Sequence, residues 1–102
     1  YWMIADVWNG LGVYRSEDLT SFVRQKNNIL KEFGTRRFDS SEGAHADVFV
    51  CGGPAFIVYF AYQNAADSPG PSVVQMAELT AENGELVCDR NRELLVDWRS
   101  EK

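Results

Sequence analysis

The chain has 102 residues, of which 45% are hydrophobic and 13% aromatic, and its net charge is −5. This length and apolar content suit one folded domain and exclude a disordered chain. The negative charge argues against nucleic-acid and anionic-membrane partners, and no apolar run approaches the roughly 20 residues that span a bilayer. Cys51 and Cys88 have neither disulfide-framework nor metal-site spacing, so we expect both thiols to be buried, with no metal or other cofactor.

The first third of the chain predicts three short strands. Residues 1–8 are almost uninterrupted apolar sequence, and Asn9-Gly10 is a strong turn signal before a partner strand at residues 12–15. Ser16 can accept backbone N–H bonds, which predicts a capped turn over residues 16–19. A third strand is expected at residues 22–25.

The rest of the chain predicts a long polar loop and then four more strands. The loop covers residues 31–44, and loops of this length are often functional. The strands are expected at residues 47–51, 55–62, 72–79 and 85–89, with turns at residues 52–54 and 81–84. Residues 92–98 suit either a helical turn or a further strand.

These strands form a pattern that occurs twice. Its copies are residues 1–6, 11–16 and 22–27, and residues 56–61, 73–79 and 86–91. Repeats at this spacing are typical of arrays and propellers, whose units cover one another. The strand at residues 56–60 is apolar on both faces and must be covered on both, so we expect Trp2, Tyr59 and Phe60 in the core.

We therefore predict an all-β fold made of antiparallel, four-stranded β-propeller blades, with a β-sandwich as the alternative. Residues 1–30 would supply the second to fourth strands of one blade, and residues 45–91 one complete blade. Residues 92–102 would be a tail or the start of the next blade. The register sets residues 1–6 against residues 56–61.

Strands in a blade run up and down, which gathers polar loop residues on one face. The predicted set is Asp6, Trp8, Asn9, Asp39, Glu42, His45 and Asp47, with Gln63, Asn64 and Asp67 from a second loop. Glycoside hydrolysis needs two carboxyl groups, one that protonates the leaving oxygen and one that activates water or attacks carbon. Aromatic rings supply platforms for sugar faces. The set therefore predicts a carbohydrate site.

Two segments carry a family resemblance. The run from Gly12 to Phe22 resembles the "Gly-Val-x-x-Ser-x-Asp-Leu-x-x-aromatic" blade motif of the five-bladed β-propeller glycosidases close to glycoside hydrolase family 43. His45-Ala46-Asp47-Val48, followed by an apolar strand, is similar to another blade of this group. The resemblance implies a hydrolase fragment of under two blades, inactive alone, whose partners are the remaining propeller blades and a carbohydrate substrate.

The same resemblance implies roles for individual residues. Asp47 would be a catalytic base or a residue that tunes the pKa of the acid, and Glu42 the general acid. His45, Asp6, Trp8, Asn9 and Asp39 are assigned to substrate binding.

Plainer interpretations stay open. Asp47 could bond backbone amides, Glu42 could be a solvated loop acid, and Trp8 could cover a blade edge. The whole could be a non-catalytic carbohydrate-binding or interaction module on the same scaffold. It could also be a small β protein that oligomerises to close a ring.

Overall fold

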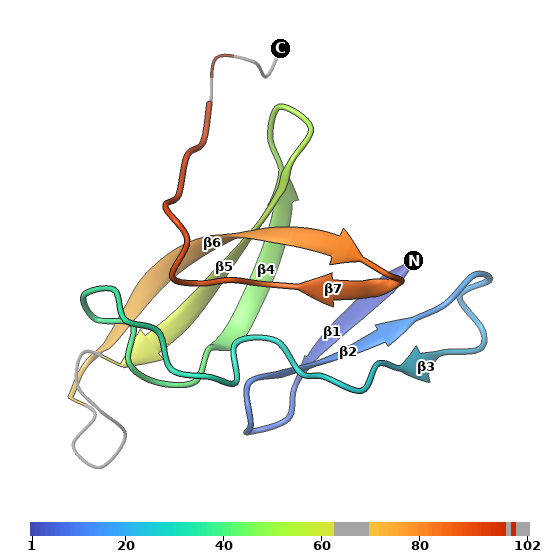
Figure 1. Ribbon diagram of the computed structural model, residues 1–102. Helices are drawn as coiled ribbons and strands as arrows, with labels where there is room; N and C mark the ends of the chain where they lie inside the picture. Colours follow the sequence, from blue (N-terminus) through green and yellow to red (C-terminus); the bar gives the residue numbers. More distant parts are fainter. Residues whose placement is uncertain (63–69, 98, 100–102) are drawn as a thin grey trace.

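The computed structural model describes residues 1–62, 70–97 and 99, and shows an all-β protein with antiparallel sheets (Figure 1). Within these residues a three-stranded sheet has the order β1-β2-β3, and a four-stranded sheet has the order β4-β5-β6-β7. The strands are β1 (Trp2–Asp6), β2 (Leu11–Arg15), β3 (Val23–Arg24), β4 (Ala44–Val50), β5 (Ala55–Tyr62), β6 (Ser72–Glu82) and β7 (Glu85–Val87). Each expected strand is therefore present; β5 has the predicted bounds, and the other strands have one or both ends shifted.

The first sheet is a meander whose turns follow from local chemistry. β1 ends at Asp6, two residues earlier than predicted, because Trp8 (φ 57°) and Gly10 (φ 71°) turn the chain towards β2. The capped turn after β2 is confirmed. Ser16 Oγ accepts the N–H of Leu19 at 2.8 Å, and Asp18 Oδ1 accepts those of the two residues that follow Leu19. These backbone donors hold the pKa of Asp18 far below its usual value.

The second sheet is also a meander. Asn83 and Gly84 both have positive φ, the geometry that two-residue hairpins require, and they join β6 to β7. The first strand differs from the prediction. β4 begins at Ala44, and its pairing with β5 shifts between Ala44 and Asp47, so Asp47 lies inside the strand after a bulge.

The core lies between the two sheets and under the long loop. Its buried side chains include Leu11, Val13, Ile29, Leu30, Ile57, Tyr59 and Leu79. Tyr59 is 1% exposed, as predicted. The core prediction is wrong for Trp2 and Phe60, which are 38% and 42% exposed, because the chain buries only one face of each sheet fully.

The two sheets stack in the same orientation. Asp6, at the end of β1, accepts the backbone N–H of His45 at the start of β4, and β4 is antiparallel to β5. The end of β1 therefore lies near the end of β5, and these strands run in the same direction (Figure 1). At the outer edge, the side-chain amide of Gln25, just after β3, bonds the backbone of Leu86 in β7.

This orientation corrects the predicted register by one residue. Ile4 packs into the core, towards the second sheet. Because the two sheets share one orientation, equivalent residues point in the same direction. Ile4 points from the first sheet towards the second, so its equivalent in the second sheet must point away from the first. Phe60 does so, whereas Tyr59, the predicted equivalent, faces the core. The cross-strand pair Ile4–Val13 then faces the same way as Phe60–Val74 and Val58–Met76.

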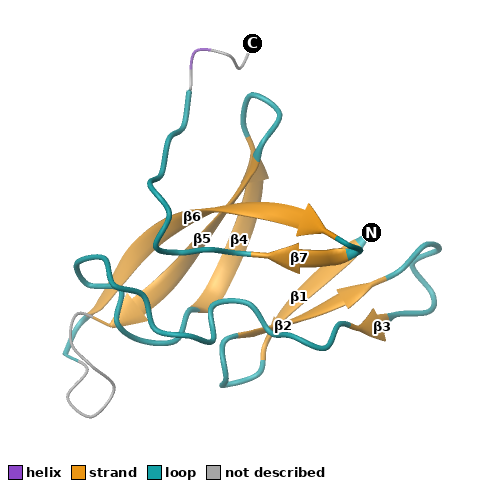
Figure 2. Ribbon diagram, viewed as in Figure 1, coloured by secondary structure: helices purple, strands orange, loops and turns teal. Residues whose placement is uncertain are grey.

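After β7 the chain has little regular structure. Residues 93–97 are neither helix nor strand, so both interpretations of this segment fail over the described residues, and Trp98 lies outside them. Helical geometry is confined to residue 99 in the described part of the chain (Figure 2). No helix among the described residues has the length and apolar character needed to cross a membrane.

Candidate functional site

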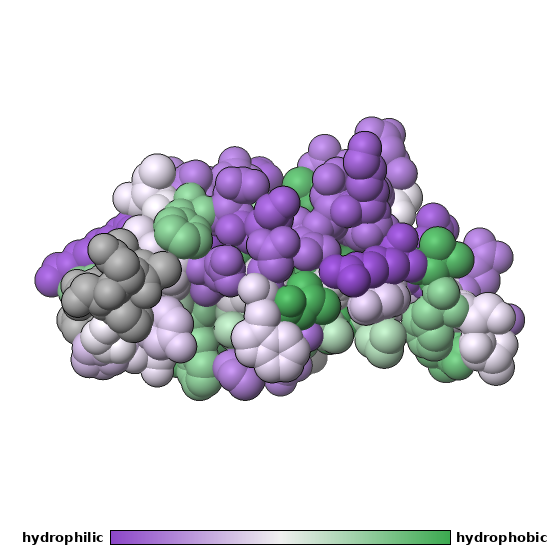
Figure 3. Space-filling model, turned by 90° about the horizontal axis from the view of Figure 1, so that it is seen from below, coloured by the Kyte–Doolittle hydropathy of each residue, from purple (hydrophilic) through white to green (hydrophobic). Residues whose placement is uncertain are grey.

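A cleft of about 500 Å³ lies where β1, β4 and β5 meet the long loop. It is lined by the polar residues Asp6, Glu42 and His45 and by the aromatic residues Trp8, Phe33 and Tyr62, among others. The molecule is seen from below in Figure 3, where hydrophobic and hydrophilic residues lie side by side. A concave surface with aromatic walls and a few polar groups is the usual form of a small-molecule site.

Asp6 orients His45 across the junction of the two sheets. Asp6 Oδ1 accepts the backbone N–H of His45 at 3.0 Å, and Asp6 Oδ2 lies 3.3 Å from His45 Nδ1. The ring also packs against Phe60, with 5.6 Å between centroids, yet the His45 side chain is 71% exposed. Because the carboxylate holds Nδ1, Nε2 is left to bond a ligand in the cleft.

Two residues of the cleft have backbone conformations that L-residues rarely adopt. Trp8 has φ 57° and His45 has φ 51°, both in the left-handed region. Each costs of order 1 kcal/mol or more, and such strain clusters at functional sites. Trp8 is also 89% exposed. A large aromatic ring held out in water on a strained backbone is better suited to a ligand than to the core.

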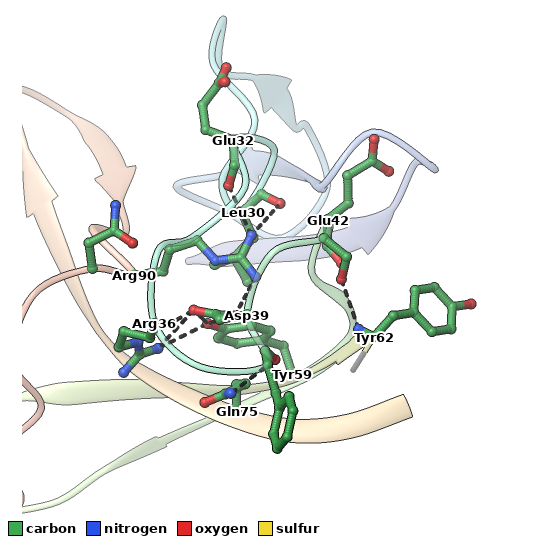
Figure 4. Close-up of polar contacts among 12 residues, drawn as sticks. Leu30, Glu32, Arg36, Asp39, Glu42, Tyr59, Tyr62, Gln75 and Arg90 are labelled. Atoms are coloured by element: carbon green, nitrogen blue, oxygen red, sulfur yellow. Dashed lines mark hydrogen bonds and ion pairs between the residues drawn. The ribbon is translucent and has the colours of Figure 1, made fainter. Parts of the chain in front are cut away.

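Glu42 reaches the cleft from the loop that precedes β4. Ser41 Oγ accepts the N–H of Tyr62 at 2.8 Å, which attaches this part of the loop to the end of β5. Figure 4 shows the Glu42 carboxylate pointing away from the buried polar cluster beside it. That carboxylate forms no hydrogen bond or ion pair with the described residues, so its oxygens are available to a ligand in the cleft.

The loop is anchored by a buried cluster of four side chains, Arg36, Asp39, Tyr59 and Arg90 (Figure 4). Asp39 is fully buried and forms ion pairs with Arg90 and with Arg36, the latter at 3.2 Å. Tyr59 donates its hydroxyl proton to Asp39 at 2.9 Å, and the Arg90 guanidinium lies 5.1 Å from the centre of its ring. Burial, the largest single cause, disfavours the charge on Arg90, but the hydrogen bonds and charges of Asp39 and Tyr59 together outweigh it and raise the pKa of Arg90.

This cluster predicts a loss of stability at alkaline pH. Burial raises the pKa of Tyr59 from 10.0 to about 12 and that of the nearby Cys88 thiol from 9.0 to about 11. Both groups hold their protons more tightly when folded, so stability is complete below about pH 9 and falls as the pH rises towards 12. Urea midpoints measured from pH 8 upwards test this. The slope above pH 10 should be smaller in Tyr59→Phe, and an unchanged slope would contradict the assignment.

Among the predicted site residues, the structure brings Asp6, Trp8, Glu42 and His45 together in the cleft. Asp39 instead lies in the protein interior, with protein donors on its oxygens.

Two further predicted residues, Asn9 and Asp47, do not line the cleft. Asn9 lies outside it, and its carbonyl oxygen accepts a bond from Asn28. Asp47 is exposed, also outside the lining, and its Oδ1 accepts the N–H of Val48 at 2.8 Å, which is the plainer interpretation of this residue. Gln63, Asn64 and Asp67 fall outside the described residues.

Sequence reasoning missed several residues of the site and its support. Phe33 lines the cleft, and the sequence signal for it is an aromatic residue, one of two with Phe38, in a polar stretch. Tyr62 lines it from the end of β5, where an exposed aromatic alternates with buried neighbours. Arg90 gave no signal, because its partner Asp39 is 51 residues away in the sequence.

Within the described residues, no group of three or more His, Cys, Asp or Glu side chains is placed to hold a metal ion. The sequence was compared with the known protein families and with curated proteins, and it matches none of them. The fold and the cleft thus define an all-β protein of antiparallel sheets with an open site of aromatic and acidic residues.

Proposed function

We propose that this chain handles carbohydrate as part of a β-propeller glycoside hydrolase of the family 43 type. The observation that carries the proposal is the cleft itself, in which Trp8 and Tyr62 offer ring faces beside Glu42 and the Asp6–His45 pair. Ring faces suit the apolar faces of sugars, and carboxylate and imidazole groups suit sugar hydroxyls. The two stacked meanders would be one complete blade and three strands of its neighbour.

Glu42 is the best candidate for the general acid. Its carboxylate lies at the cleft and forms no hydrogen bond or ion pair with the described residues, so it can reach a glycosidic oxygen of a bound sugar. Asp6 is a poorer candidate, because both of its oxygens already hold His45. Asp47, the candidate base, lies on β4 beyond the cleft lining. The second catalytic carboxylate is then Asp47 brought into reach by adjoining blades, or a carboxylate of those blades.

Trp8→Ala is expected to weaken sugar binding about tenfold. An aromatic platform contributes roughly 0.5–1.5 kcal/mol beyond its buried area, and 1.4 kcal/mol is a factor of ten in affinity. Xylohexaose, arabinohexaose and cellohexaose serve as probes, with amide shifts of His45 and the indole signal of Trp8 followed by NMR. Leu95→Ala, which removes another highly exposed apolar side chain away from the cleft, is the control. Saturable His45 shifts in wild type and Leu95→Ala that need about tenfold more sugar in Trp8→Ala would support the proposal. No saturable shift with any of the three sugars would contradict it.

A second candidate function is carbohydrate binding without hydrolysis. It is favoured by the observation that, of the two carboxylates that line the cleft within the described residues, Asp6 is committed to His45. The parent protein decides between the two functions. Hydrolysis of aryl glycosides that is lost in Glu42→Gln, with sugar binding retained, supports the enzyme, whereas binding with no hydrolysis supports the module.

A further inference from the structure

The aromatic rings of the cleft carry no cation of the chain. In the described part of the protein, an arginine guanidinium lies 4.5 to 5.7 Å from the ring centres of four other aromatic residues, Trp2, Tyr14, Phe38 and Tyr59. No described lysine or arginine lies over the exposed rings of Trp8, Phe33 and Tyr62, which line the cleft. Because the face of an aromatic ring attracts a cation, these rings are open to a positive group of a ligand.

The charged groups of the cleft have the opposite sign to such a ligand. Asp6 and Glu42 are carboxylates, and among the described lining residues there is no lysine or arginine. Lys31, whose backbone lies close to Gly10, lines two other hollows instead. An acidic sugar would therefore meet repulsion in the cleft, whereas a sugar with a positive group would be attracted.

Glu42 is the carboxylate that is available to a cation. Both oxygens of Asp6 hold His45, whereas the Glu42 carboxylate forms no hydrogen bond or ion pair with the described residues. Glu42 is also close to an aromatic ring, because Ser41, directly before it, accepts the N–H of Tyr62 at 2.8 Å. Figure 4 shows the side chains of Glu42 and Tyr62 both pointing away from the buried cluster. A free carboxylate together with aromatic rings is a combination that binds an organic ammonium group.

We propose that the sugar bound in this cleft is an amino sugar, whose ammonium group pairs with Glu42 and packs against the aromatic wall. The inference rests on the proposed function, because the ligand is a sugar in the same cleft, and it names the class of that sugar. The ammonium group adds an ion pair and a cation–π contact to the ring stacking that a neutral sugar also makes. At an exposed site each of these contacts increases affinity a few-fold, so together they favour the amino sugar by about tenfold.

A matched pair of oligosaccharides isolates the ammonium group. The β-1,4-linked glucosamine hexamer and cellohexaose have the same rings, linkage and length, and differ in an ammonium group or a hydroxyl at C2. At about pH 5.5 the amines are protonated and exposed carboxylates are ionised. Hexalysine supplies positive charge without sugar rings. NMR titrations at low salt follow the His45 amide and the Trp8 indole in wild type, in Glu42→Gln and in Glu17→Gln, whose exposed acid lies outside the cleft. Circular dichroism melts confirm that each variant is folded.

Wild type and Glu17→Gln are expected to bind the glucosamine hexamer at least about tenfold more tightly than cellohexaose. Glu42→Gln should bind the two hexamers equally, with its affinity for cellohexaose little changed. Equal binding of the two hexamers by wild type would overturn this inference and leave the proposed function standing. A preference that persists in Glu42→Gln would also overturn it, as would hexalysine that binds as tightly as the glucosamine hexamer. Absence of saturable shifts with every sugar would contradict the proposed function itself, and this inference with it.

Discussion

Asp39→Asn is expected to destabilise the fold by about 3–5 kcal/mol, the usual cost of breaking a buried ion pair by removing one partner. The substitution keeps the size of the side chain but leaves Arg90, which is 4% exposed, without a counter-charge. Arg90 Nε already has no partner among the described residues, so its charge depends heavily on Asp39. A loss of this size is a large share of the roughly 5–15 kcal/mol that stabilises a typical domain. Urea unfolding at pH 7 measures it.

A matched surface pair provides the control. Arg92 and Glu78 lie 3.9 Å apart with side chains 61% and 28% exposed, and Glu78→Gln should cost no more than about 1 kcal/mol. The double variant Asp39→Asn/Arg90→Met should regain much of the loss, because it removes the buried charge as well. If Asp39→Asn costs as little as Glu78→Gln, the cluster does not anchor the loop.

The anchoring cluster also decides how the cleft is built. Asp39 and Ser41 are buried in the loop that leads to Glu42, and they attach that loop to Tyr59 and Tyr62 of β5. One wall of the cleft therefore depends on buried polar bonds rather than on a regular strand. Removing Asp39 should loosen Glu42 even under conditions where the sheets remain folded.

The strands and their order were predictable from the sequence because turn residues separate the apolar runs. Asn83-Gly84 favours a tight hairpin turn and Ser16 favours a capped turn, and the structure contains both turns. The register was not predictable to the residue. A strand that is apolar on both faces, such as β5, carries no period-two signal, so the repeat could be aligned one residue off. The contacts of Asp6 with His45 and of Gln25 with Leu86 reveal the orientation.

In the candidate site, too, the features that depend on strand order were predictable and those that depend on burial were not. Asp6, Trp8, Glu42 and His45 were brought to one place by an argument from up-and-down topology, which depends only on strand order. Asp39 could not be separated from them by sequence, because a buried carboxylate and a solvated one look alike until the partner arginines are placed. Trp2 and Phe60 could not be assigned correctly either, because burial depends on whether a neighbouring layer covers each sheet face.

Gly10→Ala is expected to cost about 2–4 kcal/mol, from the left-handed backbone of an L-residue and from overpacking. Gly10 has φ 71°, and a Cβ there would lie 2.6 Å from the backbone nitrogen of Lys31 and would also meet the carbonyl oxygen of Ile29. These are main-chain atoms, so no side-chain rotation can relieve the contact. Leu11 and Ile29 exchange backbone hydrogen bonds of 2.8 and 3.0 Å at this point, and the added methyl group forces them apart.

Gly53→Ala separates the two causes of that loss. Gly53 has φ 103°, but a Cβ there would have nothing within 4 Å, so it should cost only the backbone strain of about 1–2 kcal/mol. Urea unfolding of both variants gives the difference. Gly10 also lines the cleft, so Gly10→Ala should weaken binding of the oligosaccharide probes while Gly53→Ala leaves it unchanged. Equal losses of stability in the two variants would mean that the long loop is not held against β2 at Gly10.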